Sequence, residues 1–194
     1  MAKYIAEFLG TCILALAVSL SITGKFPVPT PVIAGLALGI SVYTLGAISG
    51  THINPAITIA LASIGKISPK DAAIYVVAQF AGAGAAMGIA AALASPAHAG
   101  AADGGAIFAA EALGTFLLGL GVVSVVLAAA PGEASGIVIG GSLLLGIGIA
   151  APASNGVLNP AVALAIGSFS ASYVAGPIVG AAAAMLLYRH VLKP

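Results

Sequence analysis

The tripeptide Asn-Pro-Ala occurs twice, in INPAITIA (residues 53–60) and in LNPAVALA (residues 158–165). Asn is a favoured N-cap of α-helices, and Pro is favoured at the first helical position, so each copy predicts a helix start. The apolar stretches that follow, residues 55–65 and 160–168, are about half as long as a membrane-spanning helix, which needs about 20 residues. We therefore expect two half-helices that enter a bilayer without crossing it. The residues involved are Asn54, Pro55, Ala56, Asn159, Pro160 and Ala161.

The composition indicates that the solvent of this chain is lipid. Of its 194 residues 61% are hydrophobic and 6% are charged, and the mean hydropathy is +1.19. A soluble domain carries about 25% charged residues. The net charge of +1 offers no surface for a polyanion, so no nucleic-acid partner is expected. The single cysteine, Cys12, lies in an apolar run and is interpreted as a small buried residue.

Six longer apolar segments predict complete membrane spans. They cover residues 5–23, 31–49, 69–94, 106–129, 136–152 and 172–191. The first has no A-x-A cleavage pattern at its end, so we expect it to be retained rather than removed as a signal peptide. Six spans put both termini on one face, together with Lys3, Lys66, Lys70, Arg189 and Lys193, and leave Lys25 on the other. The positive-inside rule makes the first face cytoplasmic, in a plasma or inner cell membrane.

The chain also repeats itself. AEFLGT (6–11) returns as AEALGT (110–115), and the two Asn-Pro-Ala copies are separated by nearly the same offset. Each half, about 1–100 and 101–194, then holds three spans and one half-helix. Because three is odd, the second half enters the membrane from the opposite face. We expect an all-α membrane protein with an inverted 3+3 repeat, forming one channel domain with its path at the midplane between the halves.

Two half-helices that enter from opposite faces meet at their N-termini near the bilayer centre. Each N-terminus carries a partial positive charge, and the amides of Asn54 and Asn159 offer N–H donors. Such a pore admits neutral molecules that accept hydrogen bonds and repels cations. The alternative, two unrelated turns, is disfavoured by the matching landmarks in both halves.

These motifs make the chain resemble the aquaporin and glycerol facilitator family, the major intrinsic proteins. The resemblance covers nearly the whole chain through AEFLGT, GTHINPAITIA, AEALGT and ASNGVLNPAVALA. It implies six spans with two re-entrant half-helices, a homotetramer with one pore per subunit, no cofactor, and water or small neutral solutes as the molecules that pass. The short loops indicate a minimal member.

Four polar residues inside the spans and loops receive structural roles. The resemblance implies that Glu7 and Glu111 accept hydrogen bonds from the backbone of the loops that carry the Asn-Pro-Ala motifs; a proton-coupling carboxylate is the alternative. His52 is expected to be buried and bonded to loop backbone, with a pore-lining pH sensor as the alternative. Gln79 is expected to form hydrogen bonds within the bundle, and a contact with the first loop stays open.

Val162 marks a departure from the family pattern. Most members have an arginine directly after the second Asn-Pro-Ala motif, which forms an outer constriction with an aromatic residue and often a histidine. Ungapped spacing places Ala34, Ile147 and Gly156 at the other positions of this selectivity filter. The four side chains predict a filter that is small, apolar and uncharged. Its width depends on whether loop side chains such as Tyr43 or Phe108 fill the space.

Glycines spaced four apart predict close approach of helix backbones. The pairs are Gly35/Gly39, Gly84/Gly88, Gly136/Gly140 and Gly176/Gly180.

The function that follows is passive passage of water, small uncharged solutes or both. A wide apolar filter favours the class of glycerol, ammonia, carbon dioxide and hydrogen peroxide. A coupled secondary transporter with the same inverted repeat and a closed structural membrane protein are the alternatives. An enzyme is disfavoured because there is no metal-ligand cluster, nucleophile–base spacing or cofactor motif. His98 and Asp103 share a loop, which is interpreted as solvated rather than metal-binding.

Overall fold

The computed structural model describes residues 1–23, 27–94 and 98–192; Lys25 and Lys193, used above for the orientation, lie outside this part. Within it, six helices are long and apolar enough to cross a membrane. They are α1 (Ala2–Ser21), α2 (Thr30–Ser49), α4 (Pro69–Leu93), α5 (Gly105–Val126), α6 (Ser135–Ala150, preceded by the 3₁₀ turn η1 at Gly132–Ala134) and α8 (Ala171–Leu187, continued by the π turn η2 at Tyr188–Leu192). The all-α fold class is confirmed, and the span limits differ from those predicted by four residues at most.

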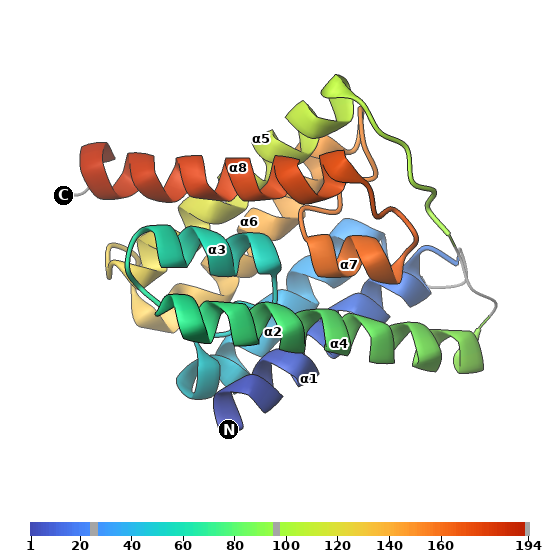
Figure 1. Cartoon of the computed structure of the whole chain (residues 1–194), viewed down its shortest axis with the longest axis horizontal. Helices are drawn as coiled ribbons and strands as arrows, with labels where there is room; N and C mark the ends of the chain where they lie inside the picture. The colour runs from blue at the N-terminus through green and yellow to red at the C-terminus, as the bar shows by residue number, and fades with distance from the viewer. Residues whose placement is uncertain (24–26, 95–97, 193–194) are drawn as a thin grey trace.

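The two short helices are α3 (Pro55–Ser63) and α7 (Pro160–Ala165), which lie on either side of the molecule's middle in Figure 1. Both end before the predicted limits of 65 and 168. The reason is a glycine in the left-handed conformation just after each helix, Gly65 at φ 72° and Gly167 at φ 73°. Such a residue closes the last helical turn and reverses the chain.

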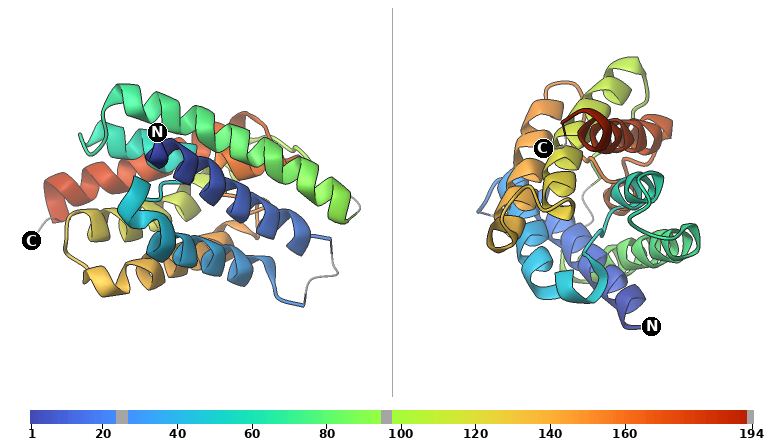
Figure 2. Two further views of the ribbon diagram at one scale, coloured as in Figure 1. Left: turned by 90° about the horizontal axis from the view of Figure 1, so that it is seen from below. Right: turned by 90° about the vertical axis from the view of Figure 1, so that its left-hand side faces the viewer.

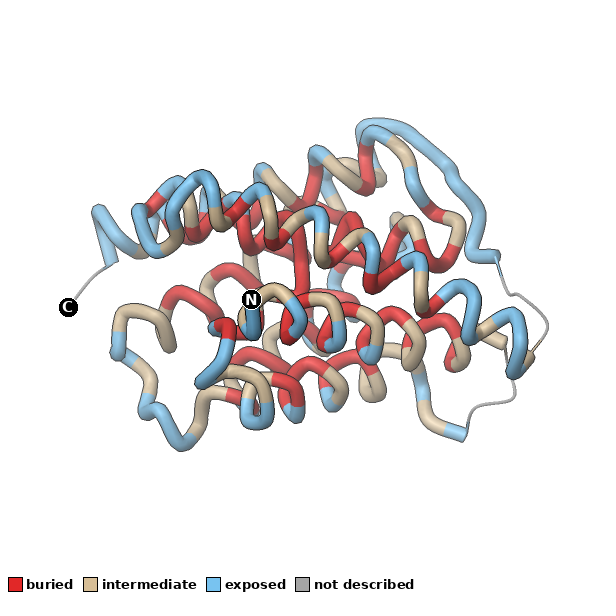
Figure 3. Tube along the Cα trace, turned by 60° about the horizontal axis from the view of Figure 1, so that its bottom comes forward, coloured by how far each residue is buried: buried red, intermediate tan, exposed pale blue. Residues whose placement is uncertain are grey.

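The two halves pack by the same scheme. Helix α4 lies against α1 as α8 lies against α5, and α3 contacts α8 as α7 contacts α4. The halves meet where α2 packs along α6, and each short helix reaches across to the other half, α3 to α8 and α7 to α4 (Figure 2). Buried residues concentrate where the long helices surround the short ones (Figure 3), so the core of the molecule is also the setting of the site.

Glycines set the distance between α2 and α6. A Cβ atom on Gly35 would lie 2.7 Å from the carbonyl oxygen of Gly140, and one on Gly39 would lie 2.7 Å from that of Gly136. Gly176 and Gly180 approach the backbone of α5 in the same way. Gly84 and Gly88 do not: a Cβ there meets nothing within 4 Å, because this face of α4 points away from the bundle. The prediction of a close helix contact is therefore wrong for this pair within the chain.

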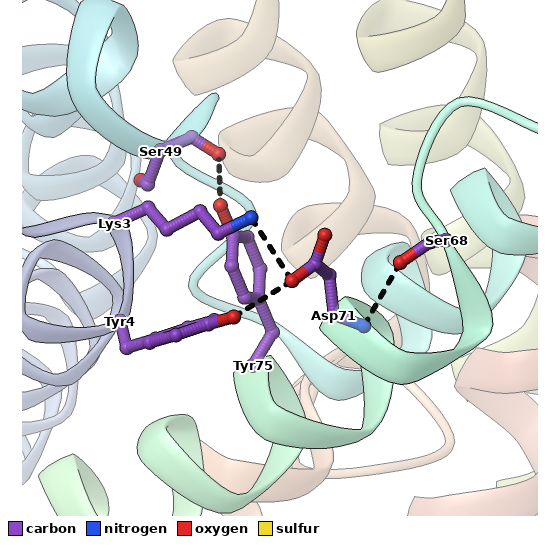
Figure 4. A network of polar contacts seen from close by, with 6 residues as sticks. All are labelled: Lys3, Tyr4, Ser49, Ser68, Asp71 and Tyr75. Atoms are coloured by element: carbon purple, nitrogen blue, oxygen red, sulfur yellow. Dashed lines mark hydrogen bonds and ion pairs between the residues drawn. The ribbon is translucent and has the colours of Figure 1, made fainter. Parts of the chain in front are cut away.

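Several basic residues gather at one end of the bundle. The Lys3 ammonium lies 2.9 Å from the Asp71 carboxylate at the start of α4, and the Tyr4 hydroxyl donates to the same carboxylate at 2.7 Å (Figure 4). Arg189 donates to the carbonyl of Ile64 beyond α3. These contacts bring the N-terminus, the start of α4 and the C-terminal turn together, as an even number of spans requires.

Candidate functional site

The two Asn-Pro-Ala motifs meet at the centre of the molecule. Asn54 caps α3, its Oδ1 accepting from the backbone N–H of Ala56 at 2.9 Å, and Asn159 caps α7, its Oδ1 accepting from that of Ala161 at 3.0 Å. With its side-chain amide, each Asn also donates across to the opposite loop. Asn54 Nδ2 donates to the Leu158 carbonyl and Asn159 Nδ2 to the Ile53 carbonyl, both at 2.9 Å.

These crossed bonds use one proton of each side-chain amide. An amide nitrogen carries two protons, so one N–H of Asn54 and one of Asn159 remains for another acceptor. Both residues line the same cavity. Asn54 and Asn159 therefore offer two N–H donors to a molecule that lies beside them in the cavity.

The loops that carry the motifs hold strained backbone. Ile53 has φ 38° and Leu158 has φ 58°, values that side-chain-bearing residues adopt rarely. Such conformations persist only where their surroundings fix them, at a cost of about 1–3 kcal/mol each. With these backbone conformations, the chain turns sharply enough for the two Asn side chains to face each other.

Two buried glutamates fix these loops. Glu7 accepts from the N–H groups of His52 (2.9 Å) and Ile53 (2.7 Å), and Glu111 accepts from those of Val157 (2.9 Å) and Leu158 (2.7 Å). Both carboxylates are fully buried. A buried N–H left without an acceptor costs about 1–3 kcal/mol, so each carboxylate contributes a large share of the stability of its loop.

Two serines extend this arrangement and were not singled out by the sequence analysis. Ser49 Oγ donates to Glu7 and Ser154 Oγ donates to Glu111, both at 2.7 Å, and each hydroxyl accepts a further loop N–H at 3.0 Å. Each serine precedes its Asn by five residues, which is the signal that could have identified them. Tyr75 donates to the Ser49 carbonyl at 2.8 Å and ties this loop to α4 (Figure 4).

Gly10 and Gly114 were also missed. A Cβ atom on Gly10 would lie 2.6 Å from Ile53 Cγ2, and one on Gly114 would lie 2.6 Å from Leu158 Cδ2. The repeated AEFLGT and AEALGT segments thus carry two functions in each half. The glutamate holds the strained loop, and the glycine three residues later makes room for the side chain just before the Asn.

Gln79 forms its hydrogen bonds within the bundle, to side chains of α1 and α3 rather than to the first loop. Its Nε2 donates to Glu7 Oε2 and to Thr58 Oγ1, both at 2.8 Å. His52 differs from expectation. Its ring is only half-buried and its Nδ1 lies 3.2 Å from the hydroxyl of Thr58 on α3, not against loop backbone. Thr58 lies one helical turn beyond Asn54 on α3, and this position brings its hydroxyl to the His52 ring.

A cavity of about 180 Å³, here called the main cavity, passes the two Asn residues. It has room for several waters, since one needs roughly 10–15 Å³ of such space. The four residues assigned to the filter all line it: Ala34, Ile147, Gly156 and Val162. Gly156 packs on Ile147, with φ 59° and space for no Cβ, because one would lie 2.9 Å from the Ile147 carbonyl oxygen.

Residues 98–104, here called the strap, border the main cavity beside Asn155. Asn155 Nδ2 donates to the carbonyls of Ala99 (3.2 Å) and Gly100 (3.1 Å), and Ala99 itself lines the cavity. Tyr43 and Phe108 are not among the lining residues, and the Tyr43 hydroxyl donates to the Glu133 carbonyl at 3.0 Å elsewhere.

Asp103 fastens the far end of this strap. Its carboxylate accepts from the hydroxyl and the N–H of Ser172 and from the N–H of Gly104. The hydrogen bond from the Ser172 hydroxyl is the main reason why the pKa of Asp103 lies below its ordinary value of 3.8. Across residues 1–23, 27–94 and 98–192, no three His, Cys, Asp or Glu side chains are grouped as a metal ion would need.

A second cavity of about 330 Å³, the end cavity, opens beyond His52 toward the loop after α2. Five residues line both cavities: Thr51, His52, Ile57, Val122 and Ile139. The two cavities therefore adjoin at these residues.

Comparison with known proteins agrees with this geometry. The model of the major intrinsic protein family matches residues 1–188. The chain belongs to this family. Family members are channels rather than enzymes, so this chain is a multi-pass membrane channel for water or small solutes.

Individual relatives align with this chain over most of their length. A probable aquaporin, AqpM of Archaeoglobus fulgidus, is 38% identical, with 81% of this chain and 74% of that protein covered. The glycerol uptake facilitator protein-like 6 of Lactiplantibacillus plantarum is 35% identical, with 97% of each covered. The X-ray structure of the aquaglyceroporin from Plasmodium falciparum superposes with a TM-score of 0.73 over 100% of this chain and 97% of that one, at 22% identity, and thus shares the fold.

Proposed function

We propose that this channel passes water and small uncharged solutes passively, including molecules as large as glycerol. The observation that carries the proposal is the composition of the filter. Ala34, Ile147, Gly156 and Val162 all line the main cavity and contribute no charge and no side-chain hydrogen-bond donor. A ring of this kind lacks the aromatic ring and the guanidinium that narrow the filter in most of the family.

Cation exclusion is assigned to the Asn-Pro-Ala centre. The N-terminus of α3, nine residues long, and that of the six-residue α7 direct partial positive charge at the cavity, and two amide N–H groups accompany it. Such a centre solvates a solute oxygen and offers nothing to a cation. Ammonia, carbon dioxide and hydrogen peroxide belong to the same neutral class. A coupled transporter would need an ionisable group that changes exposure, whereas Glu7 and Glu111 are held by loop N–H groups.

The proposal extends to the setting of the channel. The whole chain is one channel domain of two inverted repeats, about 1–100 and 101–194, and it assembles as a homotetramer in the cell membrane. Both termini face the cytoplasm, which is supported by the cluster of Lys3, Lys66, Lys70 and Arg189 around one end of the bundle.

Val162→Arg tests the filter. In reconstituted vesicles followed by stopped-flow light scattering, we expect wild type to pass water and glycerol. The variant should keep water passage and lose glycerol passage by about tenfold or more, because a guanidinium fills and charges the ring. Val162→Leu adds bulk without charge, so its glycerol passage should lie between that of wild type and that of Val162→Arg. Glycerol passage that is equal in wild type and Val162→Arg would place the constriction elsewhere.

A further inference from the structure

The five residues that line both cavities are here called the neck: Thr51, His52, Ile57, Val122 and Ile139. The path of the proposed channel runs past them. Three are aliphatic, so the polar character of the neck's side chains rests on Thr51 and His52. What these two offer a passing molecule depends on where their protons are.

The hydroxyl of Thr58 determines the proton position on His52. This hydroxyl has one proton, which it donates to the Asn54 carbonyl at 3.0 Å. It has two acceptor positions, and Gln79 Nε2 occupies one of them at 2.8 Å. The remaining partner is His52 Nδ1, at 3.2 Å, which must therefore be the donor. In a neutral imidazole with its proton on Nδ1, Nε2 is an acceptor.

His52 Nε2 is left open to the path. It makes no hydrogen bond within the described part of the chain, and it is not one of the buried polar atoms without a partner there, which are Thr11 Oγ1, Ser19 Oγ and Gln79 Oε1. The ring edge packs against Tyr75 with centroids 5.1 Å apart, and no carboxylate described in the structure bonds to the ring. A neutral ring is expected in such a setting.

Thr51, like His52, is left with a hydrogen-bond acceptor. Its hydroxyl donates to the Ser41 carbonyl at 3.2 Å, so its proton is committed and its lone pairs remain. The backbone of Thr51 has φ 50°, an unusual value for a β-branched residue, and this conformation orients the residue in the loop.

We propose that the neck is an acceptor-only site, formed by His52 Nε2 and Thr51 Oγ1, which favours solutes that donate hydrogen bonds. The proposal rests on the channel function and sharpens it. The centre at Asn54 and Asn159 offers donors, and the neck offers acceptors, so a solute that both accepts and donates finds a partner at both places. Water, ammonia and hydroxylated molecules meet this condition. Molecules that only accept hydrogen bonds, carbon dioxide among them, find no partner at the neck and should pass more slowly than donors of similar size.

The proton position is measured directly on wild type. Ring ¹⁵N chemical shifts of ¹⁵N-histidine-labelled protein, with the signal assigned through His52→Leu, should show His52 protonated on Nδ1. Thr58→Val removes the hydroxyl that accepts from His52 Nδ1, so the ring should lose its preference for a proton on Nδ1. Thr58→Ser keeps a hydroxyl there and should retain that preference. A His52 ring protonated on Nε2 in wild type would overturn the proposal.

Transport is measured on the same samples in vesicles. We expect His52→Leu to lower water permeability by about tenfold, the effect of one lost hydrogen bond along the path. His190→Leu, the same change at the exposed C-terminal end, should match wild type. Wild type should speed glycerol entry but not that of dimethyl sulfoxide, a smaller molecule that only accepts.

The outcomes separate the two proposals. Wild-type vesicles no more permeable than protein-free vesicles would overturn the channel function and the acceptor neck together. Two results would overturn the acceptor neck alone. One is a permeable wild type with an equally permeable His52→Leu. The other is a wild type that speeds dimethyl sulfoxide entry over protein-free vesicles by the same factor as glycerol entry.

Discussion

Single residues determine whether the two loops can reach the centre. Glu7 and Glu111 satisfy the loop N–H groups, and Gly10 and Gly114 leave space for Ile53 and Leu158. The same division of labour in both halves explains why AEFLGT and AEALGT recur with both residues in place. Neither role is local, because each residue acts on a loop more than 40 positions away in the chain.

Gly114→Ala should therefore destabilise the protein. The added Cβ would lie 2.6 Å from the Gly146 carbonyl oxygen as well as from Leu158, and backbone cannot move aside cheaply. We expect the free energy of unfolding to fall by about 1–3 kcal/mol, as for other overpacked cores. Thermal unfolding in detergent measures the change. Gly88→Ala is the matched control, with open space around the new methyl group, and should be neutral or slightly stabilising. Equal midpoints for the two variants would contradict the packing role of Gly114.

At the scale of elements, the strap of residues 98–104 is held by a titratable group. Because the folded pKa of Asp103 is lowered by the Ser172 hydroxyl bond, its contribution to docking is present above the ordinary value of 3.8. It is lost as the pH falls through the lower, folded value. The strap should thus stay docked at neutral pH and loosen in acid.

Asp103→Asn should loosen the strap at neutral pH, as protonation of Asp103 does in acid. Hydrogen exchange of residues 98–104, followed by mass spectrometry at pH 7, should be faster in the variant than in wild type. Glu133→Gln, a change of charge in the exposed turn η1, is the control and should leave this exchange unaltered. Unchanged exchange in Asp103→Asn would show that the strap is held by Asn155 instead.

The elements themselves were predictable because their signals are local. Hydropathy located the spans. The pairs Asn54-Pro55 and Asn159-Pro160 identified the first residues of α3 and α7. The helix ends were less predictable, since Gly65 and Gly167 stop α3 and α7 through a backbone conformation that hydropathy does not encode. Partners across the fold were harder still. The bond of His52 to Thr58 and those of Ser49 and Ser154 to the glutamates depend on how a loop lies over a helix.

At the scale of the whole molecule, α3 and α7 bring both Asn-Pro-Ala motifs to one cavity, which adjoins a second cavity at five shared lining residues. Each Asn has one side-chain N–H left for an acceptor there. We propose that neutral molecules follow this path and that cations do not.

Paired water and proton fluxes on one vesicle preparation test that claim most directly. Water flux is followed by light scattering after an osmotic step, and proton flux by an enclosed pH-sensitive dye under a potassium diffusion potential. We predict a water flux well above that of protein-free vesicles, with a proton flux equal to theirs. A proton flux that rises with the amount of reconstituted protein would contradict it.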